Sequence, residues 1–234
     1  MKKVLLFLHL ILIGFSQTTT TNYPITASND NEFHSLASPE GLIVSEMLEF
    51  GSQQWWTRSS FPEDEIQEGY DDGKMILSLN YGNGVWALVM SGTSGYGSQT
   101  WWTRSYFPED EIKKGWDDGK RITSLSYGNG IWALVMSNVP GVTNGGQQWR
   151  TRSSFPEDEI KKGWDDGKMI TSINYGNGVW ALVMTPDAGY ISQQWWTRSY
   201  FPKNEIEEGW NNGRIITSLN YGNGVWVLVM TKIS

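Results

Sequence analysis

Residues 121–136 read RITSLSYGNGIWALVM, and this stretch decides the fold. Its first part, residues 121–127, is rich in β-branched and small residues, as strands are. The following Gly-Asn-Gly, residues 128–130, favours a type I′ hairpin turn, because Asn and Gly both tolerate positive φ. The continuous apolar run at residues 131–136 is typical of a strand buried on both faces. The stretch therefore predicts a β-hairpin inside a core.

This hairpin recurs along the chain. Its tryptophans are spaced 46, 48 and 46 residues apart, at Trp86, Trp132, Trp180 and Trp226. A period of this length marks a solenoid, a propeller or an array. Between successive hairpins lies a Phe-Pro-acidic segment, residues 107–119 in one copy. Its proline fits the start of a helix and its acids complement the helix dipole, so we expect a short helix of two to three turns.

We expect a mainly β, propeller-like domain of tandem repeats of about 47 residues, with one short helix per repeat. The hairpin occurs five times, if a degenerate (worn) copy at residues 33–47 is included. About five blades would result, the last one completed by an N-terminal strand at residues 18–27. An open stack of repeats is the alternative. The expected repeat domain spans residues 33–234, with units at about 33–74, 75–120, 121–168 and 169–214 and a half unit at 215–234.

The N-terminus predicts export. Lys2 and Lys3 precede an apolar run at residues 4–15, which is typical of a signal peptide at residues 1–16 and shorter than a membrane span. Residues 17–32 would form a tether or the closing strand. We therefore expect a secreted, periplasmic or cell-surface protein that does not span the membrane after signal cleavage. There is no cysteine, so no disulfide framework, and the net charge of −7 argues against a nucleic-acid partner.

Residues for catalysis are scarce. After signal cleavage His34 is the one histidine, and it lies in the worn copy, so nucleophile–base systems are almost excluded. The repeated Asp-Asp-Gly motif could suggest Ca²⁺ ligands, but the fourth copy reads Asn-Asn-Gly at residues 211–213, which suits a turn better. We expect a protein that is not an enzyme and that has no catalytic residue, metal site or cofactor. A degenerate propeller glycosidase is a remote alternative.

The tryptophan-rich strand before each helix is the candidate binding site. Its first tryptophan is expected to face the core in every copy: Trp55, Trp101, Trp149 and Trp195. The next position accepts arginine in one copy and is therefore not fully buried. An arginine follows two residues later, on the same face. The predicted ligand-binding residues are Trp56, Arg58, Trp102, Arg104, Arg150, Arg152, Trp196 and Arg198. They would form either a structural cation–π contact or a surface that stacks a sugar or binds a carboxylate-bearing peptide.

The repeat resembles the C-terminal repeat region of plant casein-kinase-I-like kinases and related bacterial repeats of unknown function. The resemblance covers roughly residues 33–234. In one copy it rests on Gln148, Trp149, Ser153, Phe155, Pro156, Ile160, Trp164, Gly167, Ile170, Thr171 and Ser172. It implies a shared fold unit and no activity, since the Gly-rich loop, His-Arg-Asp and Asp-Phe-Gly motifs of a kinase domain are absent.

These observations predict non-enzymatic recognition. Near-identical repeats present the same set of side chains several times, which favours multivalent binding of a glycan or an extracellular protein. A structural or surface scaffold without a small ligand is the second possibility.

Overall fold

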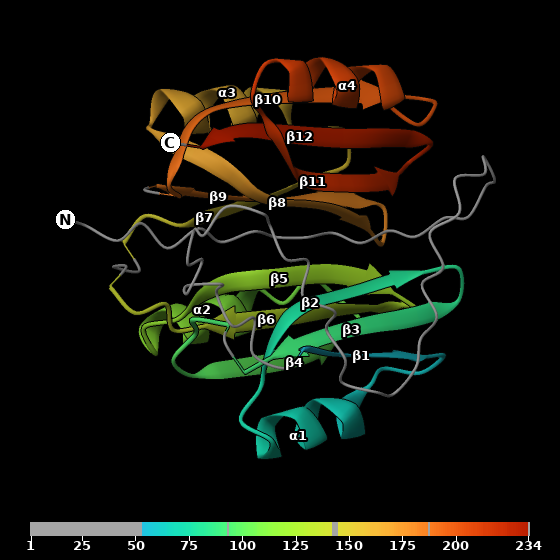
Figure 1. The fold of residues 1–234 in the computed structure, drawn as a ribbon, viewed down its shortest axis with the longest axis vertical. Coiled ribbons are helices and arrows are strands. Elements are labelled where there is room, and N and C mark those ends of the chain that lie inside the picture. The colour runs from blue at the N-terminus through green and yellow to red at the C-terminus, as the bar shows by residue number, and fades with distance from the viewer. Residues whose placement is uncertain (1–52, 93, 142–144, 187, 234) are drawn as a thin grey trace, which may run out of the picture. The chain divides into compact units, whose positions relative to one another are not determined.

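The computed structural model describes residues 53–92, 94–141, 145–186 and 188–233. The expected signal peptide, the tether or closing strand, and the worn hairpin with His34 all lie outside these residues. The described chain is mainly β, with a helix in each of four repeats (Figure 1).

Each repeat begins with an outer strand that leads into a helix. The outer strands are β1 (Gln53–Arg58), β4 (Gln99–Arg104), β7 (Gln148–Arg152) and β10 (Tyr190–Arg198). The helices are α1 (Glu63–Asp71), α2 (Glu109–Asp117), α3 (Glu157–Asp165) and α4 (Lys203–Asn211). Each helix has nine residues and follows a proline, so the predicted short helix is confirmed.

A hairpin follows each helix. Its first strands are β2 (Met75–Gly82), β5 (Arg121–Gly128), β8 (Lys168–Gly176) and β11 (Ile215–Gly222). Its second strands are β3 (Val85–Ser91), β6 (Ile131–Ser137), β9 (Val179–Pro186) and β12 (Val225–Ile233). In each turn the asparagine has φ of 48–50° and the next glycine has φ of 80–83°, as the predicted type I′ turn requires.

These elements form four three-stranded antiparallel sheets, in the orders β1-β3-β2, β4-β6-β5, β7-β9-β8 and β10-β12-β11. The apolar strand is therefore central in each sheet. In β6 and β9 this strand is buried on both faces, as its composition predicts.

The outer strand joins the hairpin that follows it in the chain. Both edges of β12 are consequently occupied, by β10 and β11. The last hairpin was expected to lack an outer strand, and β10 takes that place. The expected closing strand at residues 18–27 lies outside the described residues and stays a prediction. The described strands form separate sheets, and the five-bladed propeller stays a prediction.

Neighbouring sheets pack face to face and share their cores. The core of the first sheet includes Ala133 and Val135 from β6, and the core of the second includes Ala181 and Val183 from β9. The third core likewise takes Val227 and Val229 from β12. Each sheet thus supplies one face to the sheet before it. None of the helices in the described ranges has the length and apolar character needed to cross a bilayer.

Candidate functional site

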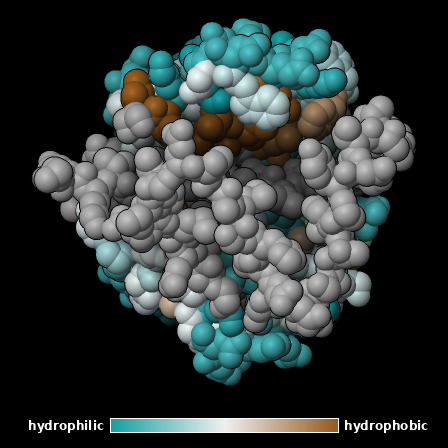
Figure 2. Space-filling model, in the orientation of Figure 1, coloured by the Kyte–Doolittle hydropathy of each residue, from teal (hydrophilic) through white to brown (hydrophobic). Residues whose placement is uncertain are grey.

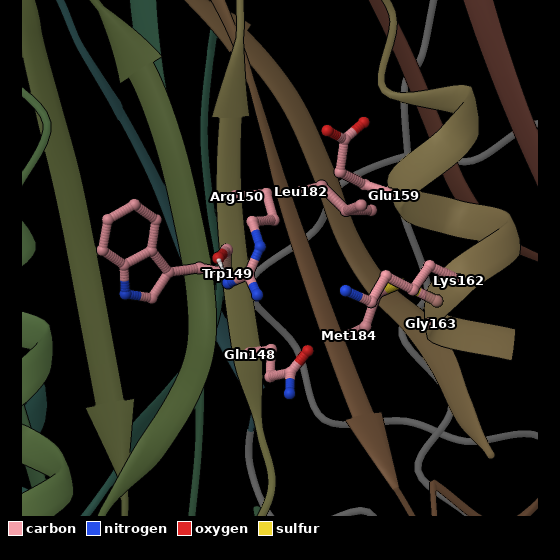
Figure 3. A pocket seen from close by; sticks show the side chains of 8 residues that line it. All are labelled: Gln148, Trp149, Arg150, Glu159, Lys162, Gly163, Leu182 and Met184. Atoms are coloured by element: carbon pink, nitrogen blue, oxygen red, sulfur yellow. Dashed lines mark hydrogen bonds between the residues drawn. The ribbon is translucent and has the colours of Figure 1, made fainter. Parts of the chain in front are cut away.

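The candidate site is built on the two faces of each outer strand. In β7 the side chains of Trp149 and Arg150 point to opposite sides of the strand, and Arg150 points toward α3 (Figure 3). Trp149 pairs with Val183 and Arg150 pairs with Leu182 in the register of β9. Because the same register holds in the other three sheets, each outer strand presents one residue set to the neighbouring sheet and another to its own helix.

The first tryptophan of the strand packs between sheets. The ring of Trp149 lies 4.9 Å from that of Phe107, which in turn meets Trp132 edge-on at 5.4 Å. Trp101 and Trp195 make the equivalent contacts, at 5.1 and 4.9 Å. Core-facing positions are thus confirmed for three of these tryptophans.

Trp55 is the exception, because 71% of it is exposed. No described sheet precedes β1, so nothing described covers this ring. The expectation that all four tryptophans face the core is therefore wrong for Trp55.

The second tryptophan of the strand lies beneath the helix of its own repeat. Trp56, Trp102 and Trp196 are half-buried and pack against the cores of their sheets. In the third repeat Arg150 is exposed instead. It lines a cavity of about 30 Å³ with Glu159, Lys162 and Met184, among other residues (Figure 3). This volume suits one or two water molecules rather than a sugar ring.

Each predicted arginine two residues later is fixed in place. Its Nε donates to a glutamate in the first turn of the helix, and its Nη1 donates to the carbonyl of the preceding residue. The ion pairs are Arg58–Glu65, Arg104–Glu111, Arg152–Glu159 and Arg198–Glu205. The Nε–Oε1 distance is 2.5 Å for Arg104 and also for Arg198, and the Arg104 Nη1 lies 2.8 Å from the carbonyl of Thr103. Two of the five guanidinium N–H groups are therefore used inside the repeat.

The surroundings of Glu205 favour its carboxylate form. Burial raises the pKa of Glu205, but a hydrogen bond to its own backbone N–H and the Arg198 guanidinium outweigh burial and leave the pKa below its usual range. Conversely, the hydrogen bond to Glu205 raises the pKa of Arg198. These contacts make the arginine and glutamate a strap between strand and helix, with part of the guanidinium still facing solvent.

The Asp-Asp-Gly motif serves as a helix end. Its glycine has a positive φ, for example +73° at Gly119, and its second aspartate approaches a nearly buried lysine. The Lys74–Asp72 pair is 2.8 Å long and the Lys168–Asp166 pair is 3.5 Å. The described residues thus give these aspartates a structural partner.

Sequence reasoning missed a polar clamp between sheets. The Gln99 side chain accepts from the backbone N–H of Ile76 at 2.7 Å and donates to its carbonyl at 3.0 Å. Gln147 and Gln193 bind Ile122 and Ile170 in the same way. The available signal was a glutamine two residues before the first tryptophan in every copy, including Gln53.

Comparisons with known proteins give the family and no activity. No curated protein and no solved structure matches the chain. Nothing in the comparisons supports the resemblance to casein-kinase-I-like repeats, which stays a prediction. A family model matches residues 20–176 and 59–232, and together these ranges cover most of the chain. The chain therefore belongs to the family described as a domain of unknown function (DUF7477).

Proposed function

We propose that this domain is a non-enzymatic recognition module that binds a glycan or an extracellular protein at several equivalent sites. One observation carries the proposal: a guanidinium is held by the same two internal hydrogen bonds in all four repeats, with part of it facing solvent. A donor that is already ordered loses little conformational entropy when a ligand binds. Four copies would convert weak single-site binding into avidity if the ligand can reach several of them.

The chemistry of these sites favours a ligand with a carboxylate or a planar polar face. Up to three guanidinium N–H groups per arginine remain for such a ligand, and two parallel N–H groups bind a carboxylate well. The half-buried edge of a neighbouring tryptophan, such as Trp102, adds an apolar surface. A glycan is slightly preferred to a protein because of these aromatic edges. Export through the predicted signal peptide would bring the domain to extracellular ligands.

The third repeat suggests a substitution for Trp102 that should preserve the fold. Truncating Trp102 to alanine would remove packing beneath α2, whereas the third repeat shows that arginine is accepted at this position. We would therefore apply residues 17–234 to a glycan array beside Trp102→Arg and Arg104→Gln. Arg150→Trp is the matched control, because it adds the aromatic group in place of removing it.

Binding that the two variants weaken, and the control keeps or strengthens, would support the proposal. Binding that is indifferent to all three substitutions would remove the outer strand as the ligand surface. Absence of any binding by the parent would shift support to the alternative, a scaffold without a small ligand. That alternative is favoured by the apolar end faces described below.

A glycosidase receives little support. The repeated first-turn glutamates are tied to arginines, and a pKa held low, as at Glu205, is opposite to what a general acid needs.

A further inference from the structure

Every sheet has two different faces. The leading face carries the first tryptophan of the outer strand and alternate residues of the central strand, such as Trp101, Ala133 and Val135. The trailing face carries the helix, the Phe of the Phe-Pro segment and the Tyr that precedes the hairpin turn, such as Phe61 and Tyr81. At all three internal junctions the leading face of one sheet covers the trailing face of the sheet before it.

These junctions are specific as well as apolar. Each contains a tilted Phe–Trp ring contact and the glutamine clamp. Each also seats a tyrosine against a glycine of the next sheet: Tyr81 at Gly128, Tyr127 at Gly176 and Tyr175 at Gly222. A Cβ atom added at Gly128 would lie 2.1 Å from Cγ of Tyr81, so only glycine admits the ring at that distance. We call the space beside this hairpin glycine the glycine seat. It accepts the tyrosine ring only when the residue has no side chain.

The first and last sheets keep the same elements without a described partner. On the leading face of the first sheet, Trp55 is 71% exposed and Val85 is 39% exposed. On the trailing face of the last sheet, Phe201 is 50% and Tyr221 is 58% exposed, although their counterparts at internal junctions are half-buried. Figure 2 shows hydrophobic surface over the upper sheets, next to the hydrophilic surface of the helices. Neither end face is covered by another sheet of the described residues.

Among the described residues, each end face carries one half of a glycine–tyrosine pair and lacks the other half. Gly82 stands in the first sheet where Gly128 stands in the second, yet no atom of the described residues lies within 4 Å of a Cβ built there. Tyr221 stands in the last sheet where Tyr81 stands in the first, and none of the glycines in the described residues packs against its ring. One end face holds an empty seat and the other holds the side chain that fills such a seat.

We infer that these two end faces bind each other between copies of this chain, so that the first sheet of one molecule covers the last sheet of the next. Gln53, Trp55 and Val85 would meet the surface that Gln193, Trp195 and Val225 meet inside the chain. The joined faces are different, so the contact is head to tail and generates filaments or rings rather than closed two-fold dimers. This surface does not use the proposed ligand-binding arginines, and its test is independent of ligand binding.

The experiment is sedimentation velocity of residues 17–234 over a series of concentrations. Gly82→Val blocks the empty seat, and valine suits a strand position that has open space around it. Tyr221→Ala removes the side chain that fills the seat. Gly92→Val is the matched control, because a Cβ built at Gly92 also has open space, whereas Gly92 follows the end of β3 and is not the hairpin glycine. Melting temperatures of all variants show whether the fold is retained.

We expect the parent and the control to grow in mass with concentration. Each of the other two variants should lose at least about tenfold in association constant, which equals about 1.4 kcal/mol. An equal mixture of Gly82→Val and Tyr221→Ala should form a two-molecule complex that does not grow, since each variant retains one intact end.

Two results would overturn the inference. One is a parent that stays monomeric at every concentration, as it would if a segment of the same chain, such as residues 33–47, covered the first sheet. The other is a failure of the variants to behave as expected, whether association persists unchanged in both or their mixture does not associate.

Discussion

Alanine substitution of the four equivalent hairpin glycines should separate the internal junctions from the open end. At Gly176 a Cβ atom would lie 2.3 Å from both Cβ and Cγ of Tyr127. Rotation of the tyrosine ring does not move its Cβ atom, so the clash is relieved only by moving the backbone or parting the second and third sheets. At Gly82 the same substitution meets no atom of the described residues within 4 Å. The two sites therefore receive the same chemical change in opposite surroundings.

The magnitudes follow from these surroundings. Overpacking of a close-packed junction costs about 1–3 kcal/mol, so Gly176→Ala should lose that much stability. Gly82 has no left-handed φ to preserve, and Gly82→Ala should gain about 0.4–1 kcal/mol by restricting the unfolded chain. The difference between the two variants is then roughly 1.5–4 kcal/mol. In a chain of this size it corresponds to about 2–4 °C of melting temperature per kcal/mol.

Urea unfolding followed by tryptophan fluorescence measures this difference. The protein should be dilute, so that contacts between molecules do not contribute. Because repeat units are coupled mainly to their neighbours, Gly176→Ala should also split or broaden the transition, with the two halves of the array unfolding separately. Gly128→Ala and Gly222→Ala should resemble Gly176→Ala. The reasoning is refuted if Gly82→Ala is as destabilising as these three, or if all four are neutral.

Three further outcomes are expected. Gln147→Ala should lower the free energy of unfolding in urea by about 1–3 kcal/mol, because the buried backbone N–H and carbonyl of Ile122 lose their partner. Gln53→Ala, at an exposed position, should leave this free energy nearly unchanged. Glu205 has a lowered pKa in the folded state, so its stabilising contribution is present above its usual pKa and is lost as pH falls below it. Melting temperatures between about pH 6 and 3 should therefore fall less steeply in Glu205→Gln than in the parent. Arg150→Trp should gain roughly 0.7 kcal/mol by filling the 30 Å³ cavity beneath α3, and a calorimetric scan showing a loss would contradict that packing.

Local features of the fold were predictable from the sequence because local chemistry decides them. The Asn-Gly pair of the hairpin tolerates two positive φ values, as at Asn129, and the proline and acids before Ile112 favour the start of a helix. The burial of β6 and β9 on both faces also followed from their continuous apolar runs. These predictions depended on a few adjacent residues.

Contacts between distant residues were harder to predict. Periodicity alone cannot show whether an outer strand joins the hairpin before it or after it. The decisive signal was the constant length between the outer strand and the following hairpin, since all length variation lies in the loop before the strand, for example at residues 137–146. The Arg104–Glu111 strap and the Gln99–Ile76 clamp were missed for the same reason, because each depends on how elements meet in space.

Trp55 shows the limit of sequence pattern most directly. Its immediate neighbours Gln54, Trp56 and Thr57 match those of Trp195, yet Trp55 is largely exposed and Trp195 is half-buried. Identical local chemistry gives different burial because the covering sheet comes from another repeat. Burial of this position is therefore a property of the array, and it changes at the ends.

The ends of such an array differ from its interior in a physically necessary way. When one face of each unit covers the opposite face of the next, an open row of units leaves one uncovered face of each kind. Terminal repeats usually solve this with a polar outer surface. The last repeat here does differ from the others, but at exposed positions in the helix or at its end, such as Lys203, Asn204 and Asn212. Phe201 and Tyr221, which belong to the junction surface, keep their aromatic side chains. A face that retains the junction residues and lacks polar replacements is built to be covered, and the first sheet carries the matching surface with an empty glycine seat.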